Sequence, residues 1–242
     1  MLESKDITMR FGKTVAVDHI SLRLEPGHIY ALLGPNGSGK TTWMKLAAGL
    51  LKPASGEMLW NGQPVGIESR KEIAYMSTEP YFYNWMTAGG VGKYYADFFG
   101  DYDAERFADL LDRMELTPEL KVKEMSSGML AKLKIAVTMA RRAKVWLLDE
   151  PFNGIDLLAR DEIARLIVES VDKDAILAMS SHLVEEMEAV VDKAVFIKKG
   201  VLAESWDLEE LRQETGLSMA DRYREVYSRQ KGGVSHGKTA AL

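Results

Sequence analysis

The sequence of 242 residues predicts an α/β fold built on a mostly parallel sheet. Two observations predict this fold. Short β-rich apolar runs alternate with longer stretches of helical character, which is typical of parallel strands connected by helices. A glycine-rich loop also joins one apolar run directly to a predicted helix. Hydrophobic residues make up 46% of the chain and charged residues 28%, as in an ordinary globular protein.

The strands and helices are placed by the spacing of their apolar residues. We expect the parallel strands at residues 29–33, 145–148, 175–179 and 194–197, with helices at 42–51 and 157–171. Residues 2–9 and 20–24 resemble antiparallel strands, and further strand candidates lie at 57–60 and 201–206. The sequence therefore predicts an added antiparallel β-layer on the N-terminal side.

Between about residues 80 and 142 the pattern changes to helices alone, rich in Met, Tyr and Phe and interrupted by Gly89, Gly90 and Pro118. This segment is predicted to form a helical sub-domain inserted in the α/β core. We expect one domain over residues 1–216. A short helix and a disordered tail are expected at 217–242, because residues 231–242 are small and polar.

The composition excludes several classes of protein. There is no cysteine, so the chain has no disulfide, no Cys-based metal site and no thiol nucleophile, and we expect a cytoplasmic location. No stretch approaches the ~18 apolar residues of a membrane span, and no secretory signal is expected. The formal net charge of −5 gives no general attraction to nucleic acid, and no nucleic-acid partner is expected.

Residues 34–41 read GPNGSGKT and match the phosphate-binding pattern GxxxxGK(S/T) between an apolar strand and a helix. The motif predicts a P-loop NTPase core whose ATP-binding residues are Gly34, Pro35, Asn36, Gly37, Ser38, Gly39, Lys40, Thr41 and Thr42. Lys40 is expected to reach the β- and γ-phosphates, and Thr41 to bind Mg²⁺. The alternative, a glycine-rich turn that binds nothing, requires neither the lysine nor the hydroxyl at these positions.

An apolar run at residues 145–148 ends in Asp149 and Glu150, at the carboxyl end of a buried strand where ligands gather in parallel sheets. Asp149 is expected to hold Mg²⁺ through water, and Glu150 to orient or deprotonate the attacking water. Acidic residues at a strand end can also be merely solvated. The phosphate-binding loop favours the catalytic interpretation.

The sequence also resembles the ABC ATPase family in four further segments: MRFG at residues 9–12, MSSGM at 125–129, NGID at 153–156 and SSH at 180–182. The resemblance extends from the N-terminal strand to about residue 216. It implies that Phe11 stacks on adenine, with a core aromatic as the alternative. It also implies that Asp156 lies at a dimer interface, and that His182 approaches the γ-phosphate and the attacking water.

The segment MSSGM occupies the place of the family signature LSGGQ, at the start of a helix. The resemblance implies that Ser126, Ser127 and Gly128 donate hydrogen bonds to the γ-phosphate held by the other subunit. Ser127 replaces a glycine, which restricts φ and leaves less room at the phosphate. Taken alone, the string is only a serine-rich helix N-cap.

One element of the family is missing, the glutamine that follows the strand corresponding to residues 73–76 and contacts Mg²⁺ or water. Either Thr78 or Glu79 is expected in its place, Thr78 by spacing and Glu79 by chemistry. An acidic loop without a catalytic part is the alternative. Neither side chain supplies both the donor and the acceptor of an amide, so coupling at this position is predicted to differ.

Residues 81–86 read YFYNWM, an aromatic run that is unusual for a solvent-facing loop. By resemblance, a helix of a transmembrane partner docks here. The alternative is that these rings form the small core of the helical sub-domain, and the two interpretations can hold for different rings.

Taken together, the motifs and the resemblance imply an ATP-hydrolysing subunit of an ABC transporter that closes as a dimer around two Mg-ATP and drives a separate transmembrane permease. The dimer contains two copies or one copy and a paralogue, at the cytoplasmic face of the membrane. The single cassette and the altered signature resemble small bacterial exporters. An ABC-type ATPase of ribosomes or DNA and a metabolic P-loop kinase are the rival hypotheses; tandem cassettes and long coiled coils, typical of the first, are absent from the sequence.

Overall fold

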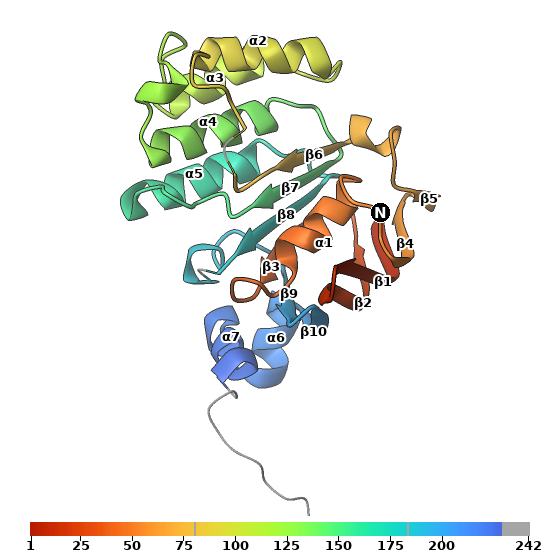
Figure 1. Ribbon diagram of the computed structural model, residues 1–242. Helices are drawn as coiled ribbons and strands as arrows, with labels where there is room; N and C mark the ends of the chain where they lie inside the picture. The colour runs from red at the N-terminus through yellow and green to blue at the C-terminus, as the bar shows by residue number, and fades with distance from the viewer. Residues whose placement is uncertain (80, 183, 229–242) are drawn as a thin grey trace, which may run out of the picture.

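The computed structural model describes residues 1–79, 81–182 and 184–228, in which two sheets are covered by helices (Figure 1). The larger sheet has six strands in the order β10-β9-β3-β8-β7-β6. These strands are β3 (His28–Leu33), β6 (Ile73–Met76), β7 (Val145–Asp149), β8 (Ile176–Ser181), β9 (Lys193–Lys198) and β10 (Val201–Asp207). All its neighbouring strands pair in parallel except β10, which is antiparallel to β9. The predicted α/β fold with a mostly parallel sheet is confirmed.

The smaller sheet has four strands in the order β2-β1-β4-β5. Its strands are β1 (Leu2–Phe11), β2 (Thr14–Leu24), β4 (Ser55–Trp60) and β5 (Gln63–Pro64), and every neighbouring pair is antiparallel. The predicted antiparallel layer is confirmed. The strand candidate at 201–206 belongs instead to the edge of the larger sheet, as β10.

Helix α1 (Lys40–Ala47) contacts strands of both sheets, and its Trp43 and Met44 are fully buried between them. The helix begins two residues earlier than predicted and ends before the predicted residue 51. Gly49 explains the early end, because its φ of +69° breaks the helical path at no steric cost.

Three helices lie between β6 and β7 in the chain and form the top of the molecule in Figure 1: α2 (Ala88–Phe98), α3 (Ala104–Arg113) and α4 (Ser127–Met139). The side chains of Thr87, Asp103 and Ser126 cap their N-termini by accepting backbone hydrogen bonds. The helices that follow β7 are α5 (Leu157–Glu169), α6 (Leu208–Thr215) and α7 (Met219–Ser228), and single turns of 3₁₀ helix lie at Ser69–Lys71, Val122–Glu124 and Val184–Glu186.

Helix α6 has no counterpart in the sequence analysis, although Asp207 caps its start and Gly216 ends it at a φ of +70°. Helix α7 is tied to the sheet by Tyr227, whose hydroxyl donates to Leu33 O at 3.0 Å and to Ile197 O at 2.9 Å. The tail predicted at 231–242 lies outside the described residues. Among the residues that the structure describes, no helix combines the length and apolar character needed to cross a membrane.

Strand β7 shows how the core positions the site. Val145 and Leu147 face the core shared with α1 and the smaller sheet, whereas Trp146 and Leu148 face the core shared with the helical sub-domain. A strand buried on both faces is apolar along its length. Its first polar residue, Asp149, therefore emerges at the carboxyl end, beside the loop that follows β3.

Candidate active site

The loop between β3 and α1 is tight, and glycines occupy its most crowded positions. At Gly39, φ is +111° and an added Cβ would lie 2.5 Å from Ala16 O, so only glycine fits. The buried Lys40 ammonium donates to Gly34 O at 2.7 Å and to Pro35 O at 3.4 Å. The buried Ser38 hydroxyl has no hydrogen-bond partner among the described residues.

A cavity of about 410 Å³ opens over this loop. It is lined by Phe11, Thr14, Val15, Ala16, Asn36, Gly37, Ser38, Gly39, Lys40, Thr41, Thr42, Thr78, Glu150 and Asn153. Phe11 is 50% exposed at the end of β1, so the alternative of a core aromatic is wrong. The structure thus brings together most of the residues predicted to bind ATP.

Asp149 is fully buried and is held by a hydroxyl from the next strand. Ser180 Oγ donates to Asp149 Oδ1 at 2.6 Å and accepts from Glu150 N at 2.9 Å, because β7 and β8 pair Asp149 with Ser180. Tyr75 Oη donates to Asp149 Oδ2 at 3.4 Å. Burial raises the pKa of Tyr75, as does the nearby charge of Asp149, so the phenol keeps the proton that it donates.

Glu150 lies between a cation and an imidazole. Its Oε1 is 3.5 Å from Lys40 Nζ, and its Oε2 is 2.9 Å from His182 Nδ1. The backbone of Glu150 has a φ of +50°, which is uncommon and costly for a residue with a side chain. The bond from Glu150 N to Ser180 helps to hold this conformation, which directs the carboxylate toward the cavity.

The segment after β6 separates the two candidates for the missing glutamine. Thr78 lines the cavity, whereas Glu79 is exposed and does not line it. The buried Lys134 of α4 donates to Ser77 O at 2.9 Å and to Thr78 O at 2.8 Å. Burial lowers the pKa of the Lys134 ammonium, and the negative charge of Asp149 opposes that shift.

The residues of the predicted signature and Asp156 do not line the cavity. Ser126 Oγ accepts from Met129 N at 3.2 Å as the cap of α4, and Asp156 Oδ1 accepts from Leu158 N at 3.3 Å as the cap of α5. The two segments meet at Gly128, where an added Cβ would lie 2.8 Å from Gly154 O. Ser126, Ser127, Gly128 and Asp156 thus lie outside this chain's own cavity lining, although Asn153 of the same segment lines it.

Several residues around the cavity were missed by sequence reasoning. Ser180 was noted only as part of the SSH segment, although its place at the end of a parallel strand was a usable signal. Asn153 was noted only as part of NGID. Nothing in the sequence distinguished Lys134 from an ordinary lysine of a predicted helical region. Residues 14–16 reach the cavity only because β2 passes beside the loop.

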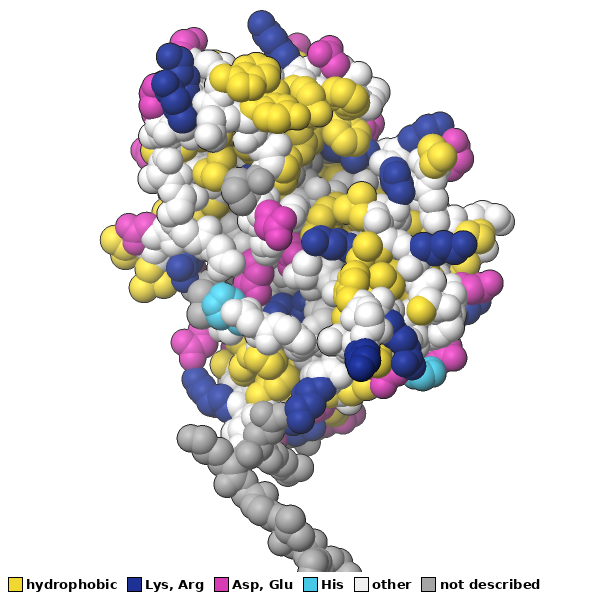
Figure 2. Space-filling view, in the orientation of Figure 1, with side chains coloured by type: hydrophobic (Ala, Val, Ile, Leu, Met, Phe, Trp, Pro, Cys, Tyr) yellow, Lys and Arg dark blue, Asp and Glu magenta, His cyan; other side chains and the backbone are white. Residues whose placement is uncertain are grey.

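The aromatic run at 81–86 divides between core and surface. Met86 is buried and Phe82 packs against the same core. Tyr83 and Trp85 are 59% and 73% exposed, and their rings stack at 5.7 Å with an interplanar angle of 9°. In Figure 2, hydrophobic side chains gather at the top of the molecule, where Figure 1 draws α2 and α3. Core and surface interpretations thus each fit different side chains of this run.

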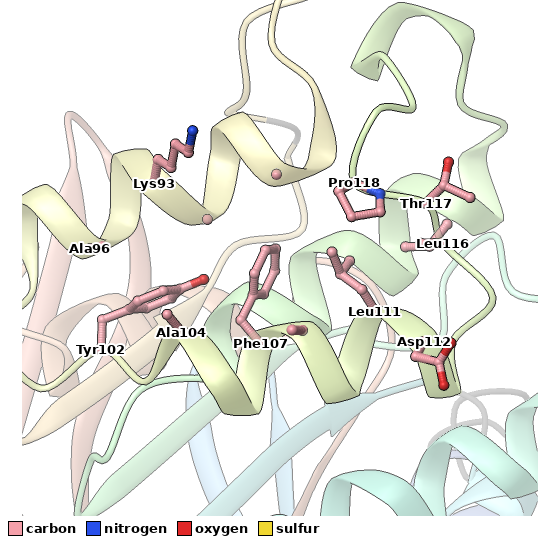
Figure 3. Close-up of a pocket in the computed structure, with 13 residues that line it drawn as sticks. Lys93, Ala96, Tyr102, Ala104, Phe107, Leu111, Asp112, Leu116, Thr117 and Pro118 are labelled. Carbon is pink, nitrogen blue, oxygen red and sulfur yellow. The ribbon is translucent and has the colours of Figure 1, made fainter.

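A second cavity, of about 430 Å³, lies in the helical sub-domain. Figure 3 shows Phe107 and Leu111 pointing from α3 toward the helix that carries Lys93 and Ala96. Leu116 and Pro118 also line this cavity, which is mostly apolar.

Comparisons with known proteins agree with this geometry. Residues 17–153, from β2 to just beyond Glu150, match the sequence model of the family described as ABC transporter. The ABC transporter ATP-binding protein YtrB of Bacillus subtilis (strain 168) is 28% identical over 246 residues, covering 97% of this chain and 84% of the relative.

The bacitracin transport ATP-binding protein BcrA of Bacillus licheniformis is 31% identical over 220 residues, covering 88% of this chain and 72% of the relative. A solved structure of an ATP-binding subunit of an ABC transporter is 26% identical with a TM-score of 0.84, covering 93% of this chain and 99% of that one. Together with the loop and the carboxylates over it, these matches show that the chain belongs to the ABC transporter family, as an ATP-binding subunit and an ATPase.

Proposed function

We propose that this ATPase closes head to tail with a second cassette around two ATP molecules, and that closure drives a transmembrane permease at the cytoplasmic face of the membrane. The observation that carries the hydrolytic part is the position of Glu150, which lines the cavity and contacts Lys40 and His182. Each further part of the proposal rests on a separate feature of the chain.

The cavity offers contacts for a nucleoside triphosphate at both ends. Phe11 offers a half-exposed ring at the rim, and a flat base can stack on it. At the other end lie the backbone N–H groups of the glycine-rich loop and the N-terminus of α1, both suited to phosphate. In this proposal Lys40 neutralises charge on the β- and γ-phosphates.

The donor set beside the phosphates fits Mg²⁺. Asp149 is a buried carboxylate with no cation in ion-pair contact among the described residues, and the Thr41 and Thr78 hydroxyls lie at the adjoining cavity. Such oxygen atoms are the ligands that Mg²⁺ prefers, often one carboxylate with substrate phosphates. When bound, the ion would supply positive charge against the phosphate oxygens. We favour Thr78 over Glu79 as the third protein oxygen.

The catalytic roles follow from the pair of contacts that Glu150 makes. Its carboxylate would orient the attacking water and accept its proton, since among the described residues it is the acidic group that lines the cavity. His182 would hold that carboxylate in place and stabilise the γ-phosphate. Ser180 keeps Asp149 and Glu150 in register for these two tasks.

The proposed dimer accounts for the signature residues, which lie outside the cavity lining. Ser126, Ser127 and Gly128 begin α4, and a helix N-terminus presents N–H donors to an anion. Because they do not line this chain's own cavity, they are available to a phosphate held by another cassette. Asp156 and the exposed Leu157 and Leu158 adjoin them. The partner cassette is a second copy or a paralogue.

The proposed permease contact is the aromatic surface, which we define as Tyr83, Trp85, Tyr94 and Phe98. All four rings are exposed, and exposed apolar patches of this kind mark interaction sites. The apolar cavity between α2 and α3 lies in the same sub-domain and has room for side chains of a docking helix. The name of the bacitracin transport relative supports a transport complex as the setting of this contact.

The proposal is tested by recovering the tagged full chain from detergent-solubilised membranes of its own organism and identifying what accompanies it. We expect a stoichiometric multi-span membrane protein, together with phosphate release from ATP that needs Mg²⁺. Recovery with ribosomes or DNA, or transfer of phosphate to a small molecule without phosphate release, would contradict it.

A further inference from the structure

Lys134 is an unusual side chain within α4. It is 7% exposed, and its ammonium donates to two successive backbone carbonyls, Ser77 O at 2.9 Å and Thr78 O at 2.8 Å. No carboxylate lies within ion-pair distance of it in the part of the chain that the structure describes. A buried ammonium without a paired anion costs stability. The two carbonyl acceptors and the charge of Asp149 offset this cost, and an apolar residue of similar size would make none of these interactions.

The two carbonyls belong to the segment that brings Thr78 to the nucleotide cavity. Ser77 and Thr78 follow β6, whose register with β7 places Met76 beside Leu148, next to Asp149. Among the described residues, this segment is also held through the Ser77 side chain, which hydrogen-bonds to Tyr75 and accepts from Glu79 N at a long 3.3 Å. Neither of these bonds involves Thr78, whose carbonyl is bound by Lys134.

Lys134 also lies on the helix that begins at the signature residues. Ser126 caps α4, and Lys134 follows about two helical turns later on the same rigid element. One side chain therefore joins the loop at this chain's own cavity to the helix whose first turn faces the other cassette in the proposed dimer.

We propose that Lys134 is a positioning residue, which holds Thr78 at the nucleotide cavity and fastens its loop to α4 so that the two move together. This inference rests on the proposed function for the consequence of the tie. The hydrogen bonds from Lys134 to the loop belong to the single chain, and their effect is measurable without ATP hydrolysis.

The test compares Lys134→Met with Lys132→Met in the full chain. Lys132 is a matched control, because it lies on the same helix and also donates to a backbone carbonyl, Met114 O at 3.2 Å, but within the helical sub-domain. For Lys134→Met we expect amide hydrogen exchange at Thr78 and Glu79 to accelerate about tenfold, since a local restraint is lost. We expect kcat for ATP hydrolysis to fall about tenfold, with the Kd for ATP without Mg²⁺ changed less than about threefold.

Lys132→Met is expected to leave all three quantities within about twofold of the unsubstituted chain. Exchange at β7 and β8 in the same experiment reports whether each variant is folded. Should Lys134→Met not fold, Lys134→Gln takes its place; its shorter amide reaches one carbonyl at most, and smaller changes of the same sign are expected.

Unchanged exchange at Thr78 and Glu79 in a folded Lys134 variant would overturn the inference, as would accelerated exchange with unchanged kcat. If the unsubstituted chain itself releases no phosphate from ATP, the proposed function fails instead. The exchange comparison then still decides whether Lys134 restrains the loop.

Discussion

The carboxyl edge of the larger sheet and the aromatic surface of the helical sub-domain depart from ordinary protein structure in opposite ways. The first buries charged side chains, namely Lys40, Asp149 and Glu150. The second exposes large rings, most of all Trp85 and Phe98. Buried charge and exposed apolar surface both cost free energy in the isolated chain. In the proposed function, Mg-ATP would offset the first cost and an apolar helix of the permease would offset the second.

Because the two regions consist of different residues, we expect mutations to affect nucleotide chemistry and partner binding separately. A change at the buried charges is expected to alter nucleotide chemistry and to leave partner binding intact. A change at the exposed rings is expected to do the reverse. The predictions below test this separation, beginning with the largest effect.

Lys40→Met is expected to weaken ATP binding roughly 100-fold, because charge-assisted bonds to phosphate are worth up to about 3 kcal/mol. The Kd is measured by titration with ATP. Lys45→Met, on the same helix but outside the cavity lining, is the control and is expected to bind normally. Equal binding by both variants would remove Lys40 from the phosphate site.

The double variant Tyr83→Ser and Trp85→Ser is expected to lower recovery of the membrane partner roughly 30-fold, as truncated aromatic anchors cost about 2 kcal/mol or more. Its ATPase rate as a purified chain is expected to stay within about twofold, since neither ring lines the cavity. Met86→Ala gives a contrast within the same run, because its buried side chain should cost about 2–5 kcal/mol of unfolding free energy. Undiminished partner recovery by the double variant would argue that the aromatic surface has another role.

Ser180→Ala is expected to lower kcat about tenfold, because it removes the hydroxyl that binds the Asp149 carboxylate and the Glu150 backbone N–H. The variant should also lose about 1–3 kcal/mol of unfolding free energy, since Glu150 N and Asp149 Oδ1 each lose a partner. Steady-state kinetics and urea unfolding measure the two effects. Ser170→Ala, whose hydroxyl bonds only within its own helix, should leave kcat unchanged.

The smallest effect concerns the cap of α3. Asp103 Oδ1 accepts from Arg106 N at 3.0 Å, and this bond, followed by that to Arg142, lowers the pKa of the Asp103 carboxyl. Asp103→Ala should cost about 1 kcal/mol near neutral pH. Since the folded pKa lies below the unfolded value of about 3.9, this stability is present above that value and is lost as the pH falls through the folded pKa.

Urea unfolding at several pH values measures the difference between Asp103→Ala and the unsubstituted chain. Asp103→Asn keeps a cap without the charge, so its loss near neutral pH should be smaller, and it too should shrink as Asp103 of the unsubstituted chain is protonated. A constant difference for the alanine variant down to pH 2 would assign the effect to something other than this carboxylate.

The sequence predicted local features of the site better than features that depend on tertiary contacts. The loop at 34–41 and the acidic end of β7 were predictable, because their chemistry depends on neighbours in the sequence. The contacts of Ser180 and Lys134 were not, since strand register and helix packing bring their partners from far along the chain. For the same reason, the sequence did not predict which side chains of residues 81–86 are buried and which are exposed. The roles of the site residues stay predictions, those of the signature, Asp156 and His182 among them.

The measurement that tests the central claim most directly is ATP turnover and dimer formation by Glu150→Gln. The account predicts that this variant binds ATP, elutes with the mass of a dimer when ATP is present, and hydrolyses it at least about 100-fold more slowly. The amide keeps the size of the side chain and removes the base. Turnover at the unsubstituted rate would contradict the account, because it would remove Glu150 from the catalytic role.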